Sequence, residues 1–235
     1  MAMNQIAPFL LFGTVALFMV ALIAWGMHYA KQRAKDLSDV AQQVGFTFVG
    51  KNWSGPSLSS PYRTSILQRT HGKFDNVMTG STSGLKVSLF DYRYTVGKST
   101  VVQTVAIFTQ DLQLPPFELR PEGLLDRIGD AVIHKDIDFD SHPEFSRRYL
   151  LRSPDEESTR KFFTPSLLNY MEQTPPEQNW TIEAVGTSLI FYRGFPLKPA
   201  DIPAFLDQTS AIARNIVSSG GITKTTGPTG IVRDF

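Results

Sequence analysis

The hydrophobic residues near the amino terminus form one unbroken run. Residues 6–30, IAPFLLFGTVALFMVALIAWGMHYA, contain no Asp, Glu, Lys or Arg. A helix of this length spans roughly 37 Å, which is more than the roughly 30 Å hydrocarbon core of a bilayer. A cleaved signal peptide would need basic residues before the run and a small-x-small cleavage site after it, and neither is present. The pattern predicts an uncleaved transmembrane helix over residues 6–30, preceded by a short extracytoplasmic segment, residues 1–5.

Basic residues flank the predicted span on one side only. No Lys or Arg precedes it, whereas three basic residues follow it directly. Because positively charged flanks tend to stay in the cytoplasm, we expect a single-pass protein with its amino terminus outside and its carboxy-terminal domain in the cytoplasm. Amphipathic rings and basic side chains favour the headgroup region. The residues predicted at this membrane interface are Trp25, His28, Tyr29, Lys31, Arg33 and Lys35.

After the predicted span, apolar residues are no longer continuous but recur at helical spacing. Leu37, Val40, Ala41 and Val44 follow one another at the spacing i, i+3, i+4 and i+7. This spacing places them on one face of a helix, and Gly45 supplies a common helix terminator. We name these four residues the stalk stripe. They predict a juxtamembrane helical stalk over residues 31–45, whose apolar face needs a partner.

Strand-like alternation follows a loop that is rich in Gly, Ser and Pro, residues 50–65. Residues 85–89 alternate apolar and polar side chains, and VGKST then provides a turn into a return strand over residues 101–108. Asp91 and Arg93 fall on one face of the first strand. We expect ordinary cross-strand ion pairs for them rather than a reactive site.

The second half of the chain suggests a strand pair followed by a helix, twice over. In the first unit, strands are expected over residues 134–141 and 145–153, joined by a loop at residues 142–144, with a helix after Ser153. In the second unit, a hairpin turns near Gly186, and a helix with one apolar face covers residues 201–218. The pattern predicts an α+β fold that ends in a ββα-ββα arrangement.

Composition supports one folded domain. Of the 235 residues, 42% are hydrophobic and 19% are charged, which is typical of a chain with a real core. We expect a cytoplasmic α+β domain over residues 46–218 and a flexible tail over residues 219–235. The net charge of +1 gives no general attraction for phosphate backbones, so nucleic acid is not an expected partner. The absence of cysteine excludes disulfides, thiolate metal sites and cysteine nucleophiles.

Candidate chemistry is concentrated in HKDIDFDSHPEF, residues 134–145. Ionisable side chains occupy its even positions: His134, Asp136, Asp138, Asp140, His142 and Glu144. On one face of a strand, imidazoles and carboxylates would suit a metal ion such as Zn, Mn or Fe. However, an amphipathic strand with Ile137 and Phe139 facing the core shows the same alternation.

The hairpin interpretation of this stretch is favoured over the metal site. Residues on one face of a strand are nearly 7 Å apart, too far for neighbours to share a metal ion without a bend. A return strand would bring Asp138 opposite Arg148 and His134 near Arg152, and the arginines would then neutralise the acids. We therefore predict no catalytic residue, no metal site and no cofactor.

Several stretches resemble a group of bacterial single-pass membrane proteins for which no activity is established. The most specific is DIDFDSHPEFSRRYLLRSPDEESTRKFF, residues 136–163, together with LFDYRYTVG, LPPFELRPE and the VGF that ends the stalk. The match covers most of residues 36–195. The resemblance implies a bacterial inner-membrane protein, and it implies no catalytic or binding residue.

These observations favour a non-enzymatic accessory or scaffold subunit, or an interaction module, of a larger membrane protein complex. Its expected partners are the lipid bilayer and other membrane proteins. One alternative is a membrane-tethered hydrolase or metal-binding enzyme that uses the acidic stretch between His134 and Glu144. A second alternative is a sensor of lipid or envelope state that uses Lys31, Arg33 and Lys35 near anionic headgroups.

Overall fold

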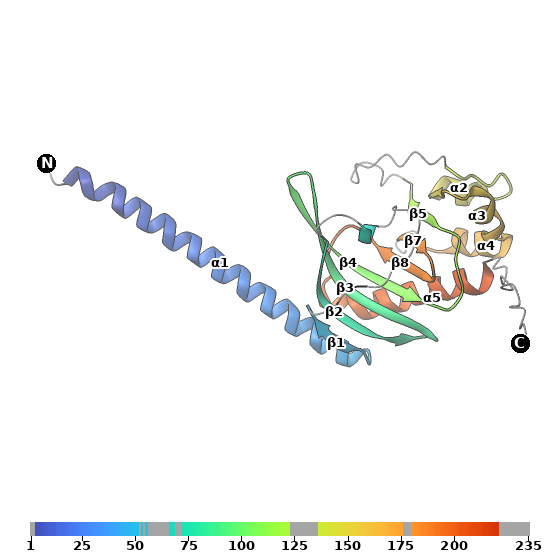
Figure 1. Ribbon diagram of the computed structural model, residues 1–235, viewed down its shortest axis with the longest axis horizontal. Helices are drawn as coiled ribbons and strands as arrows, with labels where there is room; N and C mark the ends of the chain where they lie inside the picture. Colours follow the sequence, from blue (N-terminus) through green and yellow to red (C-terminus); the bar gives the residue numbers. More distant parts are fainter. Residues whose placement is uncertain are drawn as a thin grey trace, which may run out of the picture.

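A long amino-terminal helix leads into a domain of mixed helices and strands (Figure 1). The computed structural model describes residues 3–51, 53, 55, 66–68, 72–122, 136–175 and 180–220. The helices are α1 (Met3–Gln43), α2 (Pro143–Arg148), α3 (Glu156–Phe162), α4 (Pro165–Gln173) and α5 (Ile202–Ser219), with 3-10 helices η1 (Ile66–Gln68) and η4 (Pro199–Asp201). The strands are β1 (Thr47–Gly50), β2 (Lys73–Thr82), β3 (Leu85–Val96), β4 (Ser99–Thr109), β5 (Phe117–Pro121), β6 (Tyr149–Arg152), β7 (Thr181–Val185) and β8 (Ser188–Tyr192). The predicted α+β class is confirmed.

The strands form an 8-stranded sheet in the order β1-β2-β3-β4-β8-β7-β5-β6. All of its pairings are antiparallel. The two predicted hairpins are β3–β4 and β7–β8, which turn at Gly97 and Gly186. These glycines have φ values of +59° and +61°, in the left-handed region that tight hairpin turns require. β5 lies inside the sheet, between β7 and β6.

Each face of the sheet has an apolar core. Helices pack on the first face, where the core includes Phe191 of β8 and extends along the chain from Leu37 in α1 to the end of α5. The predicted stripe of α5 is buried in this core, as Ile202, Phe205, Leu206, Ile212, Ala213 and Ile216. The second face has a separate cluster that includes Tyr92 of β3 and Ile66 of η1. The carboxy-terminal end of α1 therefore belongs to the same core as α5.

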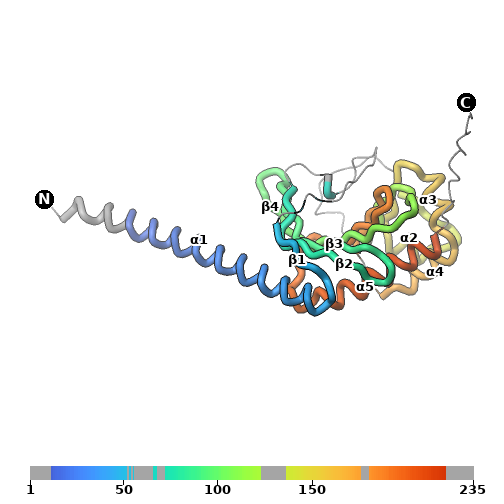
Figure 2. Tube along the Cα trace, turned by 60° about the horizontal axis from the view of Figure 1, so that its bottom comes forward, coloured from blue at the N-terminus to red at the C-terminus, as the bar shows by residue number. Residues whose placement is uncertain are grey.

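Helix α1 continues without a break from the predicted span through the predicted stalk to Gln43. Figure 2 shows its carboxy-terminal turns against the domain and its amino-terminal part extending away. Gly45 has a φ of +75° and ends the helical path, as expected. Leu37 and Ala41 are 1% and 0% exposed, and Val40 and Val44 pack against the same core. The stalk stripe thus packs on the protein's own domain, so it is not a free surface for a partner.

The second ββα unit is confirmed by β7, β8 and α5, but the first unit differs from the prediction. Residues 137–142 are not part of a strand, and α2 begins at Pro143. Asp136 forms an isolated bridge with Arg152, so the predicted register is shifted by two residues. Pro143 at the first helical position disfavours a continuing strand and favours a helix start. His134 and residues 221–235 of the predicted tail lie outside the described residues.

Candidate functional site: the helix–domain junction

A buried ion pair joins α1 to the sheet. The Arg33 guanidinium donates two hydrogen bonds to the Asp91 carboxylate, from Nε to Oδ2 at 2.8 Å and from Nη2 to Oδ1 at 2.7 Å. The Asp91 side chain is 5% exposed and that of Arg33 is 15% exposed. A two-pronged pair of this kind fixes orientation as well as charge. The ion pair therefore fixes the orientation of α1 relative to β3.

Neighbouring strands complete the environment of the Asp91 carboxylate. Asn76 Nδ2 donates to Asp91 Oδ2 at 2.8 Å, and Thr104 Oγ1 donates to Asp91 Oδ1 at 3.1 Å. Asn76 lies where the register of β2 shifts, and its φ is +53°. Asn tolerates this left-handed conformation better than most residues do. The shift of register in β2 thus occurs at Asn76, whose side-chain amide hydrogen-bonds to the buried Asp91 carboxylate and helps to stabilise its charge.

The loop between β8 and α5 also binds to this cluster. Arg33 Nη1 donates to the carbonyl oxygen of Leu197 at 2.9 Å, and the Leu197 N–H donates to Thr104 Oγ1 at 2.9 Å. We call Arg33, Asn76, Asp91, Thr104 and Leu197 the helix–domain junction. It brings together segments that are far apart in the sequence.

Most members of the junction had no signal in the sequence. Asp91 was expected to pair across the sheet, but its partner is Arg33, 58 residues away. The cross-strand pair in this region is instead Arg93 with Asp75, at 2.9 Å. The irregularity at Asn76 and the backbone contacts of Leu197 depend on tertiary structure, and periodicity in the sequence does not encode them.

Arg33 differs in its surroundings from the other residues predicted at the membrane interface. Trp25 and Tyr29 are 70% and 64% exposed. His28, Lys31 and Lys35 are also exposed. All of these side chains remain free to meet lipid, and their assignment to the interface stays a prediction. The Arg33 guanidinium is directed into the domain.

The acidic stretch that suggested a metal site does not converge in the described residues. Asp136 Oδ1 accepts a hydrogen bond from the Leu151 N–H at 3.0 Å, whereas Asp138 and Asp140 are exposed. His142 Nδ1 lies 3.4 Å from Glu172 Oε2, and Glu144 pairs with Arg147. The side chains thus point to separate partners. Within the described part of the chain, no group of three or more His, Asp or Glu side chains is placed to hold a metal ion.

Arg148 and Glu172 link α2 to α4 in place of the predicted pairing between Arg148 and Asp138. The Arg148 guanidinium donates to the carbonyl oxygens of Glu172 and Thr174 at the end of α4. Glu172 Oε1 in turn accepts from the N–H of Phe145 at 3.1 Å, in the first turn of α2. The first N–H groups and the last carbonyl groups of a helix have no partner inside that helix. Arg148 and Glu172 supply partners for these groups at the end of α4 and the start of α2. Glu144 in the first turn and the arginines in the last were a helix signal that the strand interpretation overlooked.

Burial affects one carboxyl group of this stretch. Desolvation raises the pKa of Asp136 above its ordinary value, and the hydrogen bond from the Leu151 N–H only partly opposes the rise. No described ion pair compensates the Asp136 carboxylate. Its environment is therefore the reverse of that of Asp91.

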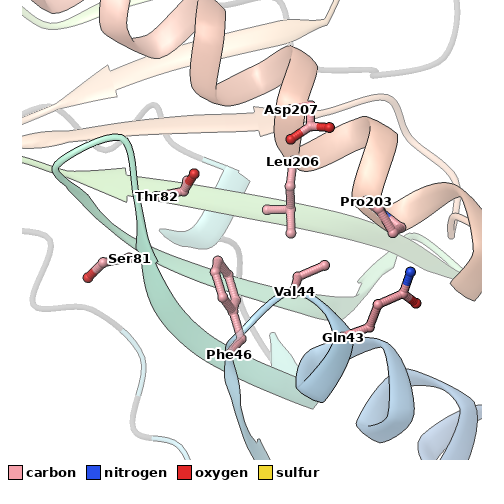
Figure 3. A pocket seen from close by; sticks show the side chains of 8 residues that line it. All are labelled: Gln43, Val44, Phe46, Ser81, Thr82, Pro203, Leu206 and Asp207. Atoms are coloured by element: carbon pink, nitrogen blue, oxygen red, sulfur yellow. The ribbon is translucent and has the colours of Figure 1, made fainter.

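A cavity of about 300 Å³ lies beside the end of α1 (Figure 3). Its lining combines the end of α1 and the start of β1 with β2 and α5: Gln43, Val44, Phe46, Ser81, Thr82, Pro203, Leu206 and Asp207. Asp207 is the only ionisable side chain in this lining.

The fold and the junction together define an α+β domain carried on a helix that is long and apolar enough to cross a membrane. No protein-family model matches the chain, and no curated protein sequence matches it. A similar fold occurs in the crystal structure of the mycobacterial trehalose monomycolate transport factor A, TtfA. The TM-score is 0.55 at 13% sequence identity, over 79% of this chain and 94% of that chain. At this identity the similarity shows the fold alone.

Proposed function

We propose that this chain is a membrane-anchored accessory subunit, without catalytic activity of its own, of a larger membrane protein complex. In the proposed topology, the chain crosses the bacterial inner membrane once and the domain lies in the cytoplasm. The helix–domain junction is the observation that carries the proposal. It favours a protein whose task is to hold a domain in a fixed position next to membrane partners.

Rigid attachment is the feature that distinguishes this domain from a merely tethered one. An enzyme that acts on soluble substrates needs only a flexible linker to remain near a membrane. Here Arg33 is bound by Asp91, and the next turns of α1 are buried in the core through Leu37 and Ala41. Orientation relative to the bilayer matters most for a protein that presents one surface to a membrane-bound partner.

The structural neighbour adds support of a different kind. TtfA is named as a transport factor, which is an accessory-type role. The acidic stretch offers less support for the enzyme alternative, because Asp136, Asp138 and His142 point to separate partners. The lipid-sensor alternative loses Arg33 as a free cation, because its guanidinium binds Asp91.

Purification of the full chain in mild detergent, followed by quantitative mass spectrometry, tests the proposal. We expect a stoichiometric membrane-protein partner to copurify. A chain that runs alone as a monomer from its native membrane would contradict the proposal.

Two variants make the purification specific to the domain. Asp91→Ala releases the junction and should reduce recovery of the partner while leaving the chain in the membrane. Asp75→Ala removes an ion pair with the exposed Arg93, away from Arg33, and should leave recovery unchanged. Equal recovery with both variants would show that the fixed orientation of the domain is not required.

A further inference from the structure

The β3–β4 hairpin projects from the sheet on the side where α1 leaves the domain. Phe46, just after α1, packs on Gly80, which pairs with Val87 of β3. Thirteen residues before Phe46, Arg33 of α1 meets Asp91 of the same strand. The path along α1 toward its amino terminus therefore follows β3 toward its end at Val96. Figures 1 and 2 show the hairpin turned toward the amino-terminal part of α1.

The length of the hairpin brings its tip to the level of the predicted membrane interface. From Asp91 to Val96, β3 advances roughly 16 Å, at about 3.3 Å per residue. From Arg33 back to Tyr29 and Trp25, α1 rises by roughly 6 Å and 12 Å. A strand inclined to the helix advances less than its full length along the helix axis. The tip then falls level with the ring side chains of α1.

The residues on this side of the domain have the chemistry of a membrane-binding surface. Val96 is 40% exposed at the tip, and exposed Lys98 follows it in the turn. Phe195 is 49% exposed, and its carbonyl accepts from the N–H of Thr104 in the junction. Exposed Lys198 lies in the same loop. Exposed apolar side chains accompanied by cations are the pattern that interfacial binding to anionic lipid uses.

We propose that the β3–β4 tip and the loop of residues 193–198 form a second membrane contact, with the surface of an anionic bilayer. We call Val96, Lys98, Phe195 and Lys198 the apposed surface. The inference rests on α1 crossing the membrane, as in the proposed function, and extends it to the lipid that the domain touches. Together with the junction, the apposed surface fixes the domain at two separated points.

Spin labels on single cysteines test this contact in the full chain, which has no native cysteine. Val96→Cys, Lys86→Cys and Phe18→Cys are reconstituted in nanodiscs of equimolar phosphatidylcholine and phosphatidylglycerol. We expect the label at Val96 to be relaxed more by lipid-soluble oxygen than by a water-soluble nickel chelate. The label at Lys86, on the opposite end of β3, should show the reverse. The label at Phe18 reports whether α1 is inserted.

The outcomes separate the two proposals. A lipid signal at Phe18 with an aqueous signal at Val96 overturns the apposed surface and leaves the anchor intact. An aqueous signal at both positions overturns the anchor as well. Reversing the charges with Lys98→Glu and Lys198→Glu should shift the Val96 label toward water, as should removal of phosphatidylglycerol. If neither change shifts it, the cationic part of the contact is wrong.

Discussion

The two parts of helix α1 have the same backbone and opposite surroundings. From Phe12 to about Tyr29, the side chains are exposed on all sides, including large apolar ones such as Phe18, at 63%. From Arg33 onward, one side of the helix is covered by the domain, with Leu37 and Ala41 buried. A helix that is apolar all round requires an apolar solvent, whereas one with a single stripe requires a packed neighbour. The periodicity thus separates the proposed membrane anchor from the docked part within one continuous helix.

We expect the largest loss of stability on removal of the Asp91 carboxylate, which binds the docked part of α1 to the sheet. Asp91→Ala leaves Arg33 without its carboxylate and should lower the free energy of unfolding by about 3 to 5 kcal/mol. Urea denaturation of the full chain in mild detergent measures this change. Asp75→Ala is the matched control and should cost about 1 kcal/mol, because its partner Arg93 is 52% exposed and stays hydrated when the pair is removed. Equal losses in the two variants would mean that the junction is no stronger than a surface pair.

The same substitution, Leu to Ala, can be made in each part of α1 to compare how much each part contributes to the stability of the domain. Leu37→Ala opens a cavity in the core and should lower the free energy of unfolding by about 2 to 5 kcal/mol. Leu22→Ala, where the side chain is 45% exposed, should leave the stability of the domain unchanged. The same denaturation measurement applies. A loss at Leu22 comparable to that at Leu37 would remove the distinction between anchor and docked part.

A smaller effect is expected where α1 leads into the sheet. A Cβ added at Gly80 would lie 2.3 Å from Cδ1 of Phe46, so Gly80→Ala must displace that ring. We expect the free energy of unfolding to fall by about 1 to 3 kcal/mol, as is typical of overpacked cores. Adding Phe46→Leu should recover part of the loss. If the double variant is less stable than the sum of the two single changes, the ring contact is not the cause.

The smallest effect contrasts Asp136 with Asp91. Burial raises the pKa of Asp136, so the folded state binds its proton more tightly than the unfolded state does. Stability therefore falls as pH rises from the ordinary carboxyl value through the raised one, and the loss persists at neutral pH. Asp136→Asn keeps an oxygen for the Leu151 N–H and should abolish this fall, giving equal or slightly higher stability at pH 7. Asp140→Asn, at an exposed position, is the matched control and should leave this fall in place.

Local patterns predicted the elements whose cause is local. Apolar residues recur at helical spacing in the stalk stripe and in the buried face of α5. The hairpin at Gly186 shows strand-like runs on either side of a turn residue. The alternation near Asp136 was assigned to a strand, although Pro143 and its flanking charges form a helix start. Ile137 and Phe145 are nevertheless buried, because apolar residues enter the core in either conformation.

The sequence does not predict the helix–domain junction, and the reason is physical. Arg33 and Asp91 were each recognised as charged, but Arg33 was assigned to the membrane interface and Asp91 to a cross-strand pair. Their contact depends on the chain reversing direction at Gly45, after α1 has ended, and on the register of β2 against β3. Such information arises only when the sheet is assembled.

The proposed function requires α1 and the domain to move as one body held at the junction. A distance measurement between spin labels at Phe18→Cys in α1 and Lys161→Cys in α3, in nanodiscs, tests it most directly. We expect a single narrow distribution of distances in the otherwise unaltered chain, and a broader one when Asp91→Ala is added. A broad distribution in the otherwise unaltered chain would contradict rigid attachment, because it would mean that the domain moves freely relative to the amino-terminal part of α1.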